Sequence, residues 1–122
     1  MDRVGSTVAV IDDDDDVRDV LRVLLESAGH EVETYKSGAQ FLESADTSQI
    51  GCLVVDQRMP RMTGLELLTE LNSRGLALPS LLITGTHDND VARKATELGA
   101  MTVLEKPMSH HELLRFVSFS LG

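Results

Sequence analysis

Apolar residues occur along this chain in short runs that alternate with longer segments in which they recur every three or four positions. Short apolar runs bounded by turn residues are typical of buried β-strands, and the longer spacing is typical of one face of a helix. The predicted strands are 7–11, 30–35, 52–55, 80–84 and 100–105. The second of these alternates apolar and polar residues, which favours a position at the edge of a sheet.

A helix is predicted after each strand. The residues expected to face the core are Val17, Val20, Leu21, Leu24 and Ala28 in the first helix, Ala39, Phe41, Leu42 and Ala45 in the second, Leu65, Leu68 and Leu71 in the third, Val91, Ala92, Ala95 and Leu98 in the fourth, and Leu113, Leu114, Phe116, Val117 and Leu121 in the fifth. Two helix starts are predicted to form capping boxes, Ser37 with Gln40 and Thr63 with Glu66, and Ser109 with Glu112 is expected to cap the last helix.

Strict alternation of strands and helices with short connections predicts an α/β fold, because each right-handed crossover places its helix on one face of a parallel sheet. We expect a doubly wound, flavodoxin-like sheet of five parallel strands in the order 2-1-3-4-5, covered by five helices. The length of 122 residues predicts a single domain over 1–122. In such a sheet the carboxyl ends of the first and third strands flank a ligand-binding crevice.

Polar residues stand where four of these strands end. Asp12 and Asp13 follow the first strand, Asp56 the third, Thr84 ends the fourth and Lys106 follows the fifth. Three carboxylates in one crevice raise one another's pKa unless a cation lies among them, and Mg²⁺ prefers such oxygen ligands. A carboxylate flanked by a metal ion, a lysine and a hydroxyl can accept a phosphoryl group. The sequence therefore predicts a Mg²⁺ site with Asp56 as the phosphoryl acceptor.

Composition narrows the remaining classes of function. The formal net charge of -9 and the pI near 4.7 argue against a nucleic-acid-binding surface. The single cysteine, Cys52, lies inside the third strand, so we expect no disulfide and a reducing compartment. No apolar run approaches the roughly 20 residues of a membrane span. We expect a cytoplasmic protein that binds no membrane.

Several motifs together resemble the response-regulator receiver domain of bacterial two-component signalling, in the CheY-like superfamily. They are Val-Ile-Asp12-Asp13, Val-Val-Asp56-Gln-Arg-Met-Pro60, Gly64, Ile-Thr84-Gly85 and Glu-Lys106-Pro107, and they span essentially the whole chain. The Arg-Met-Pro, Ile-Thr-Gly and Glu-Lys-Pro segments are most similar to the FixJ-type branch. The resemblance implies a receiver domain and not a turnover enzyme, with self-phosphorylation and self-dephosphorylation as its only chemistry.

The resemblance also implies roles for single residues. Asp56 would take a phosphoryl group from a sensor histidine kinase or a phosphotransfer protein. Asp13, Asp56 and the backbone carbonyl of Arg58 would ligate Mg²⁺ directly, and Asp12 would act through water. The bond between Lys106 and the following proline would be cis. The conformational change that follows phosphorylation would pass to the surface of helix four, strand five and helix five. The same surface could also join two copies as a homodimer.

One position departs from the family, and two other functions stay open. Val103 stands where the family usually has Tyr or Phe, so we expect signalling through the connection from strand four to helix four and through that helix, or a weak switch. One alternative is a phosphohydrolase of the haloacid-dehalogenase type, although Arg58 stands where that class places its second acid. The other is a docking module that is never phosphorylated.

Overall fold

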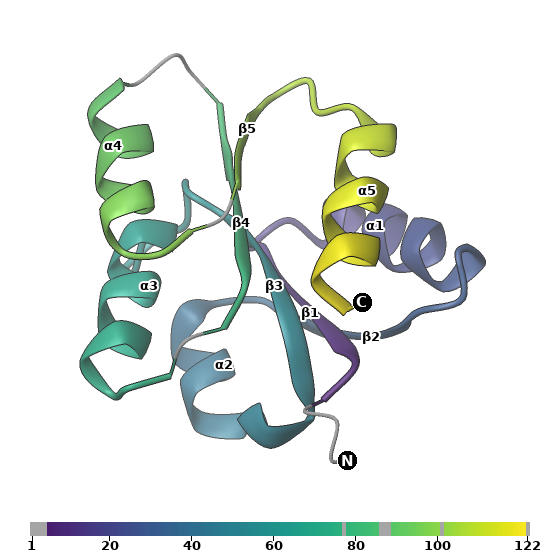
Figure 1. Ribbon diagram of the computed structural model, residues 1–122, viewed down its shortest axis with the longest axis horizontal. Coiled ribbons are helices and arrows are strands. Elements are labelled where there is room, and N and C mark those ends of the chain that lie inside the picture. The colour runs from purple at the N-terminus through teal and green to yellow at the C-terminus, as the bar shows by residue number, and fades with distance from the viewer. Residues whose placement is uncertain (1–4, 77, 86–88, 101, 122) are drawn as a thin grey trace.

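The computed structural model describes residues 5–76, 78–85, 89–100 and 102–121, and it contains five strands and five α-helices in strict alternation (Figure 1). The strands are β1 (Thr7–Ile11), β2 (Glu31–Tyr35), β3 (Ile50–Asp56), β4 (Ser80–Thr84) and β5 (Thr102–Glu105). The α-helices are α1 (Asp15–Ser27), α2 (Gly38–Ser44), α3 (Gly64–Ser73), α4 (Asn89–Glu97) and α5 (His110–Leu121), and a 3-10 turn, η1 (Thr47–Gln49), precedes β3.

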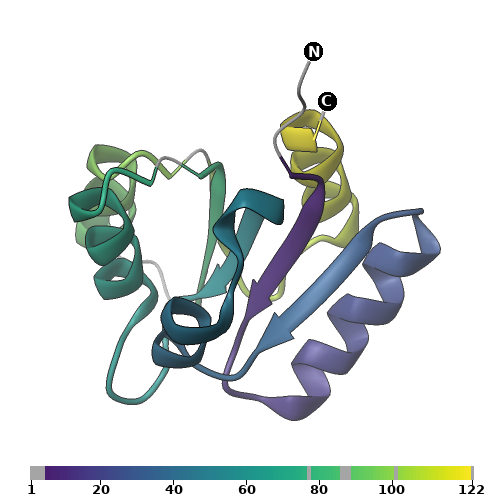
Figure 2. The ribbon, with the colours of Figure 1, turned by 90° about the horizontal axis from the view of Figure 1, so that it is seen from below.

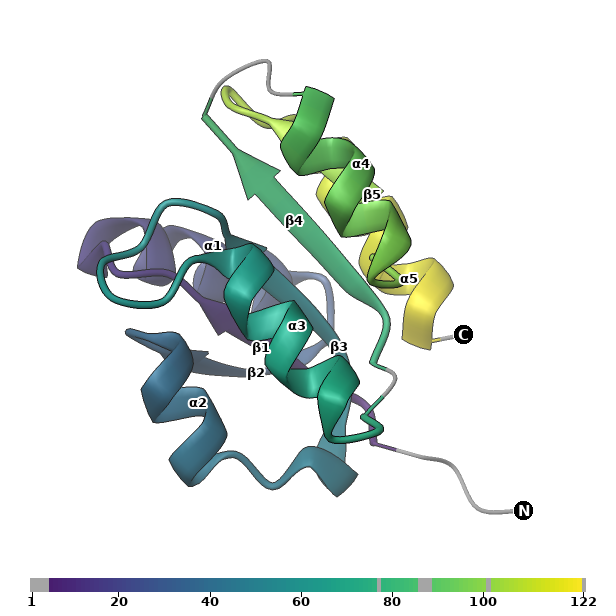
Figure 3. The same cartoon turned by 90° about the vertical axis from the view of Figure 1, so that its left-hand side faces the viewer.

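All strand pairs are parallel and the sheet order is β2-β1-β3-β4-β5. This confirms the predicted doubly wound sheet, with β2 at one edge. Figure 2 shows α1 and α5 together on one face and α3 and α4 on the other, and Figure 3 shows α2 on the same face as α3. The last predicted strand begins two residues later than expected, at Thr102, and Met101 lies outside the described residues.

Alternate residues of β1 and β3 belong to two separate apolar cores. Ala9 and Leu53 pack with the helices α2, α3 and α4, whereas Val8 and Val54 pack with α1 and α5. Every residue of β1 and β3 is buried. Because helices cover both faces, these strands read as continuous apolar runs and not as alternating ones.

The buried face of α1 agrees with the prediction only in part: Leu21 is buried and Val17 and Leu24 pack half-buried against the core, as expected. Leu21 and Leu25 are its buried residues, whereas Val20 is 53% exposed and Ala28 is exposed as well. Six aliphatic side chains lie between positions 17 and 25, so more than one helical stripe satisfies the apolar spacing. Packing against the sheet selects the stripe that contains Leu25.

The two predicted capping boxes have different outcomes. At α3, Thr63 and Glu66 form the reciprocal pair in full. At α2 the Ser37 hydroxyl accepts a hydrogen bond from the Gln40 N–H at 3.0 Å, but the Gln40 side chain accepts from the N–H of Lys36 and not from that of Ser37. The second box is therefore only half formed. Within the described part of the chain, each helix is too short or too polar to cross a lipid bilayer.

Candidate functional site

Asp12, Asp13 and Asp56 meet at the carboxyl ends of the two central strands. One carboxylate oxygen from each lies within 4.8 Å of the others. The register explains this meeting: Ile11 of β1 pairs with Val55 of β3, so the residue that follows each partner comes to the same level of the sheet. Asp12 and Asp56 are each only 3% exposed, while Asp13 is exposed. The structure thus brings together all three acids that the sequence singled out.

Burial raises the pKa of two of these acids. Loss of hydration is the main cause of a pKa of about 6 for Asp12, and the negative charge of Asp56 adds to it. The Asp14 N–H donates to Asp12 Oδ1 at 2.9 Å and opposes that shift by stabilising the ionised carboxylate. The pKa of Asp56 is also raised, again mainly by loss of hydration. The site therefore favours a positive charge placed among the three carboxylates.

Lys106 provides one positive charge. Its Nζ lies 3.0 Å from Asp56 Oδ1, an oxygen that makes no well-aligned hydrogen bond and is held by this ion pair. The lysine side chain is 46% exposed while that of Asp56 is only 4% exposed, so the ammonium reaches the acid from the solvent side. The Lys106 N–H donates to the Thr84 carbonyl at 2.8 Å, and the peptide bond to Pro107 is cis as predicted.

Thr84 is the last residue of β4 and is 5% exposed. It lies beside the site in register, because Asp56 pairs with the preceding residue, Ile83. Thr84 also lines a hollow of about 390 Å³ between α4 and β5, together with Val103 and Asn89. A second hollow, of about 280 Å³, contains Asp12 and Lys106. The predicted hydroxyl donor therefore lies at the boundary between the acidic site and the α4–β5 side of the molecule.

The connection from β3 to α3 carries Arg58 and is anchored through Gln57. The Gln57 N–H donates to the Ile83 carbonyl at 2.8 Å, its own carbonyl accepts from the Gly64 N–H at 3.1 Å, and its side chain accepts from the Leu65 N–H at 2.8 Å. A Cβ on Gly64 would lie 2.8 Å from the Asp56 carbonyl oxygen, so only glycine allows this close approach. The backbone N–H of Arg58 stabilises the ionised Asp56, while the Arg58 side chain is exposed.

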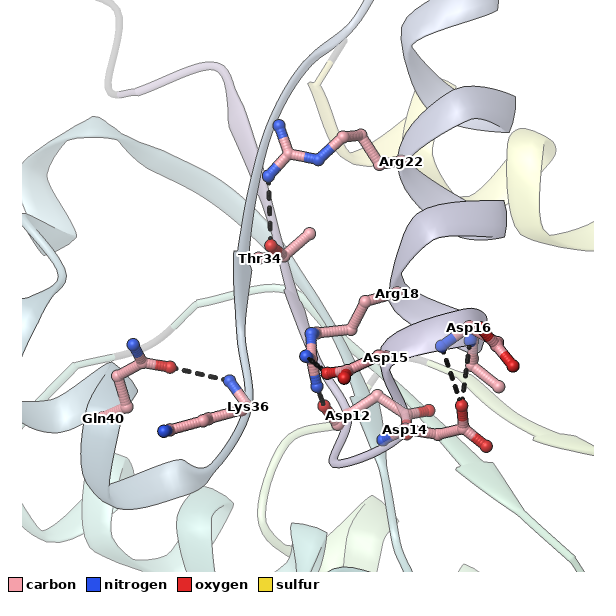
Figure 4. A network of polar contacts seen from close by, with 10 residues as sticks. Asp12, Asp14, Asp15, Asp16, Arg18, Arg22, Thr34, Lys36 and Gln40 are labelled. Atoms are coloured by element: carbon pink, nitrogen blue, oxygen red, sulfur yellow. Dashed lines mark hydrogen bonds and ion pairs between the residues drawn. The ribbon is translucent and has the colours of Figure 1, made fainter.

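The connection from β1 to α1 is held by polar contacts that Figure 4 shows. Asp14 is the N-cap of α1, and its carboxylate accepts from the N–H groups of Asp16 and Val17. The Arg18 guanidinium donates to the Asp12 carbonyl oxygen at 2.6 Å and pairs with the Asp15 carboxylate. Sequence reasoning missed this role of Arg18. The only available signal was a basic residue one turn into a helix that begins with a run of acids.

The residues fit a hard divalent cation. Three carboxylate oxygens lie within 4.8 Å of one another, and the single ammonium of Lys106, paired with Asp56 Oδ1 at 3.0 Å, leaves the cluster with excess negative charge. Oxygen-only donor sets suit Mg²⁺, which keeps several waters when one or two carboxylates bind it. Asp13 and Asp56 are the acids that could hold the ion, with Asp12 beside them. No thiol belongs to the cluster, since Cys52 is buried within β3.

Comparisons with known proteins agree with this geometry. The response regulator receiver domain family matches residues 8–118. The transcriptional regulatory protein FixJ of Azorhizobium caulinodans is 46% identical over 94% of the chain, which covers 54% of that relative. The response regulator protein TodT of Pseudomonas putida is 36% identical over 96% of the chain, which covers 52% of that relative. The chain thus spans about half the length of these relatives.

Solved structures give the same result. The crystal structure of FixJ-N superposes with a TM-score of 0.86 at 34% identity, covering 99% of this chain and 95% of that one. The response regulator StyR superposes with a TM-score of 0.88 at 43% identity, covering 94% of this chain and 58% of that one. The fold is therefore shared with receiver domains.

Proposed function

Because this chain belongs to the response regulator receiver domain family, we propose that Asp56 is its phosphoryl acceptor and that residues 1–122 form one receiver domain. One observation carries the assignment. Asp56 is the only one of the three acids that is both 3% exposed and 3.0 Å from an ammonium group. The phosphohydrolase alternative is not favoured, since Arg58 occupies the position of its second acid.

The reaction forms a bond between one oxygen of Asp56 and phosphorus, and it breaks the P–N bond of a phosphohistidine. The electron pair of the broken bond stays on the imidazole nitrogen. Asp56 must be ionised to attack, and the ammonium of Lys106 favours that form. Because the lysine side chain is 46% exposed, it can follow the charge from the carboxylate to a phosphoryl oxygen. A Mg²⁺ ion held by Asp13, Asp56 and the Arg58 carbonyl would supply neutralisation of charge on the equatorial oxygens.

The test uses a small phosphodonor, acetyl phosphate, with Mg²⁺. We expect a mass gain of one phosphoryl group that is stable in acid, is removed by hydroxylamine, and is absent from Asp56→Asn. Asp19→Asn, an exposed carboxylate on α1, is the matched control and should behave as wild type. A mass gain that persists in Asp56→Asn would contradict the assignment. A protein that is never modified would be a docking module, and one that continuously releases phosphate from unrelated esters would be a phosphohydrolase.

Donors and partners follow from the same site. We propose a sensor histidine kinase or a phosphotransfer protein as the donor, in the cytoplasm, and no direct contact of this domain with nucleic acid, in keeping with the net charge of -9. FixJ of Azorhizobium caulinodans is a transcriptional regulatory protein, and TodT of Pseudomonas putida is a response regulator protein. Control of an output domain or partner by this receiver is therefore a proposal that rests on those relatives.

Phosphorylation would change the α4–β5–α5 surface, where two copies could associate. A groove of about 640 Å³ runs along β5 and α5, and Phe119 beside it is 76% exposed. We expect Phe119→Ser to weaken any dimer that forms on phosphorylation, as measured by sedimentation equilibrium with and without acetyl phosphate. Val23→Ser, which removes a similarly exposed apolar side chain from α1, is the control.

Val103 stands where the family usually has an aromatic residue, so we expect a different conformational response to phosphorylation. Val103 lines the hollow of about 390 Å³ between α4 and β5 with Thr84, and the described residues around this hollow include no aromatic ring. We propose that the response passes through the β4–α4 connection and α4, or that it is weak. Structures determined with and without a phosphoryl mimic would test this, since no displacement there would contradict the route through α4 and leave only the weak response. Residues 86–88 of the connection lie outside the described residues.

A further inference from the structure

Among the described residues, Arg18 is the one basic residue whose side chain contacts the backbone of the acidic loop, residues 12–16. It starts in the first turns of α1 and folds back, so that one guanidinium nitrogen lies 2.6 Å from the Asp12 carbonyl oxygen and the other pairs with Asp15 (Figure 4). Its side chain is 14% exposed, which is low for an arginine in an ion pair. A guanidinium can bind two acceptors in a fixed geometry, which an ammonium cannot do.

The bond to Asp12 fixes a peptide group and not only a side chain. The Asp12 N–H donates to the Tyr35 carbonyl of β2 at 3.1 Å, and the Asp12 carbonyl accepts from Arg18 at 2.6 Å. That carbonyl belongs to the peptide group linking Asp12 and Asp13. Its orientation therefore sets the direction in which the Asp13 side chain leaves the backbone.

Asp13 depends on this backbone more than its two neighbours do. Asp12 Oδ1 accepts from the Asp14 N–H, and Asp56 Oδ1 is paired with Lys106. Asp13 is exposed, and within the described residues no hydrogen bond or ion pair to its carboxylate is present. Only the peptide group before it and its own rotamer preferences direct its carboxylate toward Asp56.

We propose that Arg18 is a positioning residue for the cation site: by fixing the Asp12–Asp13 peptide group it holds the Asp13 carboxylate where it faces Asp56. This inference rests on the proposed function, because it assumes that Asp13 and Asp56 hold a divalent cation. Arg18 itself touches neither the ion nor the phosphoryl group.

The sign of one measurement separates positioning from plain electrostatics. A positive charge near a cation site repels the ion, so a variant that only loses this charge should bind the cation slightly more tightly. A variant that loses the positioning bond should bind it more weakly, because residues that orient metal ligands are typically worth about 10-fold to 100-fold in affinity. The two effects have opposite signs, and both are measured in the absence of phosphorylation.

Arg22 is the matched control on the same helix. It lies one turn further on, donates to the Thr34 hydroxyl at 3.0 Å and pairs with Glu26 at 3.7 Å, and among the described residues it makes no polar contact with residues 12–16. Arg22→Gln removes the same charge from α1 and breaks a similar number of polar contacts. It should leave cation affinity unchanged or slightly increased.

The experiment measures Mn²⁺ binding by electron paramagnetic resonance for the wild type, Arg18→Gln, Arg18→Lys, Arg22→Gln and Asp13→Asn. We expect Arg18→Gln to bind Mn²⁺ about 10-fold more weakly, and Arg18→Lys to fall between it and wild type because lysine keeps one of the two contacts. Urea unfolding without metal, followed by circular dichroism, is measured for the same proteins. A residue that only stabilises the fold would lower the unfolding midpoint and leave the Mn²⁺ affinity of the folded protein unchanged.

Each outcome decides between the two proposals. Weaker binding by Arg18→Gln with partial recovery in Arg18→Lys supports positioning. Wild-type or tighter binding by Arg18→Gln, while Asp13→Asn abolishes binding, overturns the role of Arg18 and leaves the proposed function intact. If the wild type binds no Mn²⁺, the cation site fails and the role of Arg18 fails with it. If Arg18→Gln does not fold, Arg18→Lys alone decides, since wild-type affinity in that variant would overturn the proposal.

Discussion

The middle of β1 and β3 and the carboxyl ends of the same strands are opposite environments separated by a single residue. Ile11 and Val55 are fully buried among apolar side chains, whereas the next residues, Asp12 and Asp56, are carboxyl groups that are just as inaccessible and have raised pKa values. Apolar burial stabilises the fold, while burial of a carboxylate opposes it. The buried apolar residues of β1 and β3 therefore hold the two acids in a position where burial of their charge costs free energy.

The largest effect on the free energy of unfolding should come from the buried apolar residues of β1 and β3. Leu53→Ala removes a fully buried side chain of β3 and should lower the free energy of unfolding by about 3 kcal/mol, because it leaves a cavity in a close-packed core. Urea unfolding followed by circular dichroism measures this loss. The control, Val23→Ala, truncates a side chain on α1 that is 63% exposed and should cost at most about 0.5 kcal/mol. Equal losses in the two variants would mean that β3 does not carry the stability assigned to it.

At the carboxyl ends of the same strands we expect the opposite result, a substitution that stabilises the fold. Asp12→Asn removes a buried negative charge and keeps an oxygen that can accept from the Asp14 N–H. We expect the metal-free protein to gain about 1 to 2 kcal/mol at pH 7, since one pKa unit corresponds to about 1.4 kcal/mol and relaxation of the site recovers part of it. The exposed acid of Asp19→Asn is the control and should change little. A variant of Asp12 that is less stable than wild type at pH 7 would refute this account of the site.

The pH dependence of stability should reflect the raised pKa of Asp12. Asp12 has a pKa of about 6 in the folded protein against 3.8 for an ordinary aspartate, so between those values the folded state binds more protons than the unfolded state. Its contribution to stability is therefore largest at low pH and falls as the pH rises toward about 6. We expect the urea midpoint of wild type relative to Asp12→Asn to drop by the equivalent of about 1 kcal/mol between pH 4.5 and pH 6.5. A constant difference between the two proteins would contradict the raised pKa.

The smallest effect should come from the connection that follows β3. Thr63→Ala removes the N-cap of α3 and should cost about 0.5 to 1 kcal/mol in the free energy of unfolding. The control is Thr69→Ala within the same helix, where the hydroxyl only donates to the Leu65 carbonyl oxygen. The two variants are compared by urea unfolding. A loss at Thr69 as large as that at Thr63 would show that the capping bond itself contributes little.

Several features of the fold could be predicted because they depend on local patterns. Apolar runs that end in Asp12 and Asp56, and the Thr63–Glu66 pair, each specify an element or its boundary within a few residues. The edge of the buried face of α1 could not be predicted, since Val20 and Leu25 flank the correctly predicted Leu21 and both are aliphatic, yet only Leu25 is buried. Contact with the sheet distinguishes them, and contact is not a property of the helix sequence.

The candidate site divides in the same way. The three acids and Lys106 were predictable, because parallel strands bring their carboxyl ends to one edge whatever the details of packing. The contact of Arg18 with the Asp12 carbonyl was not, since it depends on how the first turn of α1 leaves the strand. The Gln40 side chain gives a second case, where loop geometry selected the N–H of Lys36 over the expected one.

The sequence by itself determined the order of elements, the parallel sheet and the identity of the residues at its carboxyl edge, because hydrophobic periodicity and strand ends are local properties. Only the tertiary structure decided how close those residues lie, which acids are buried and which of them have raised pKa values. Distances and hydration depend on the register between β1 and β3 and on the helices packed beside them. Both are set by segments that are far apart in the chain.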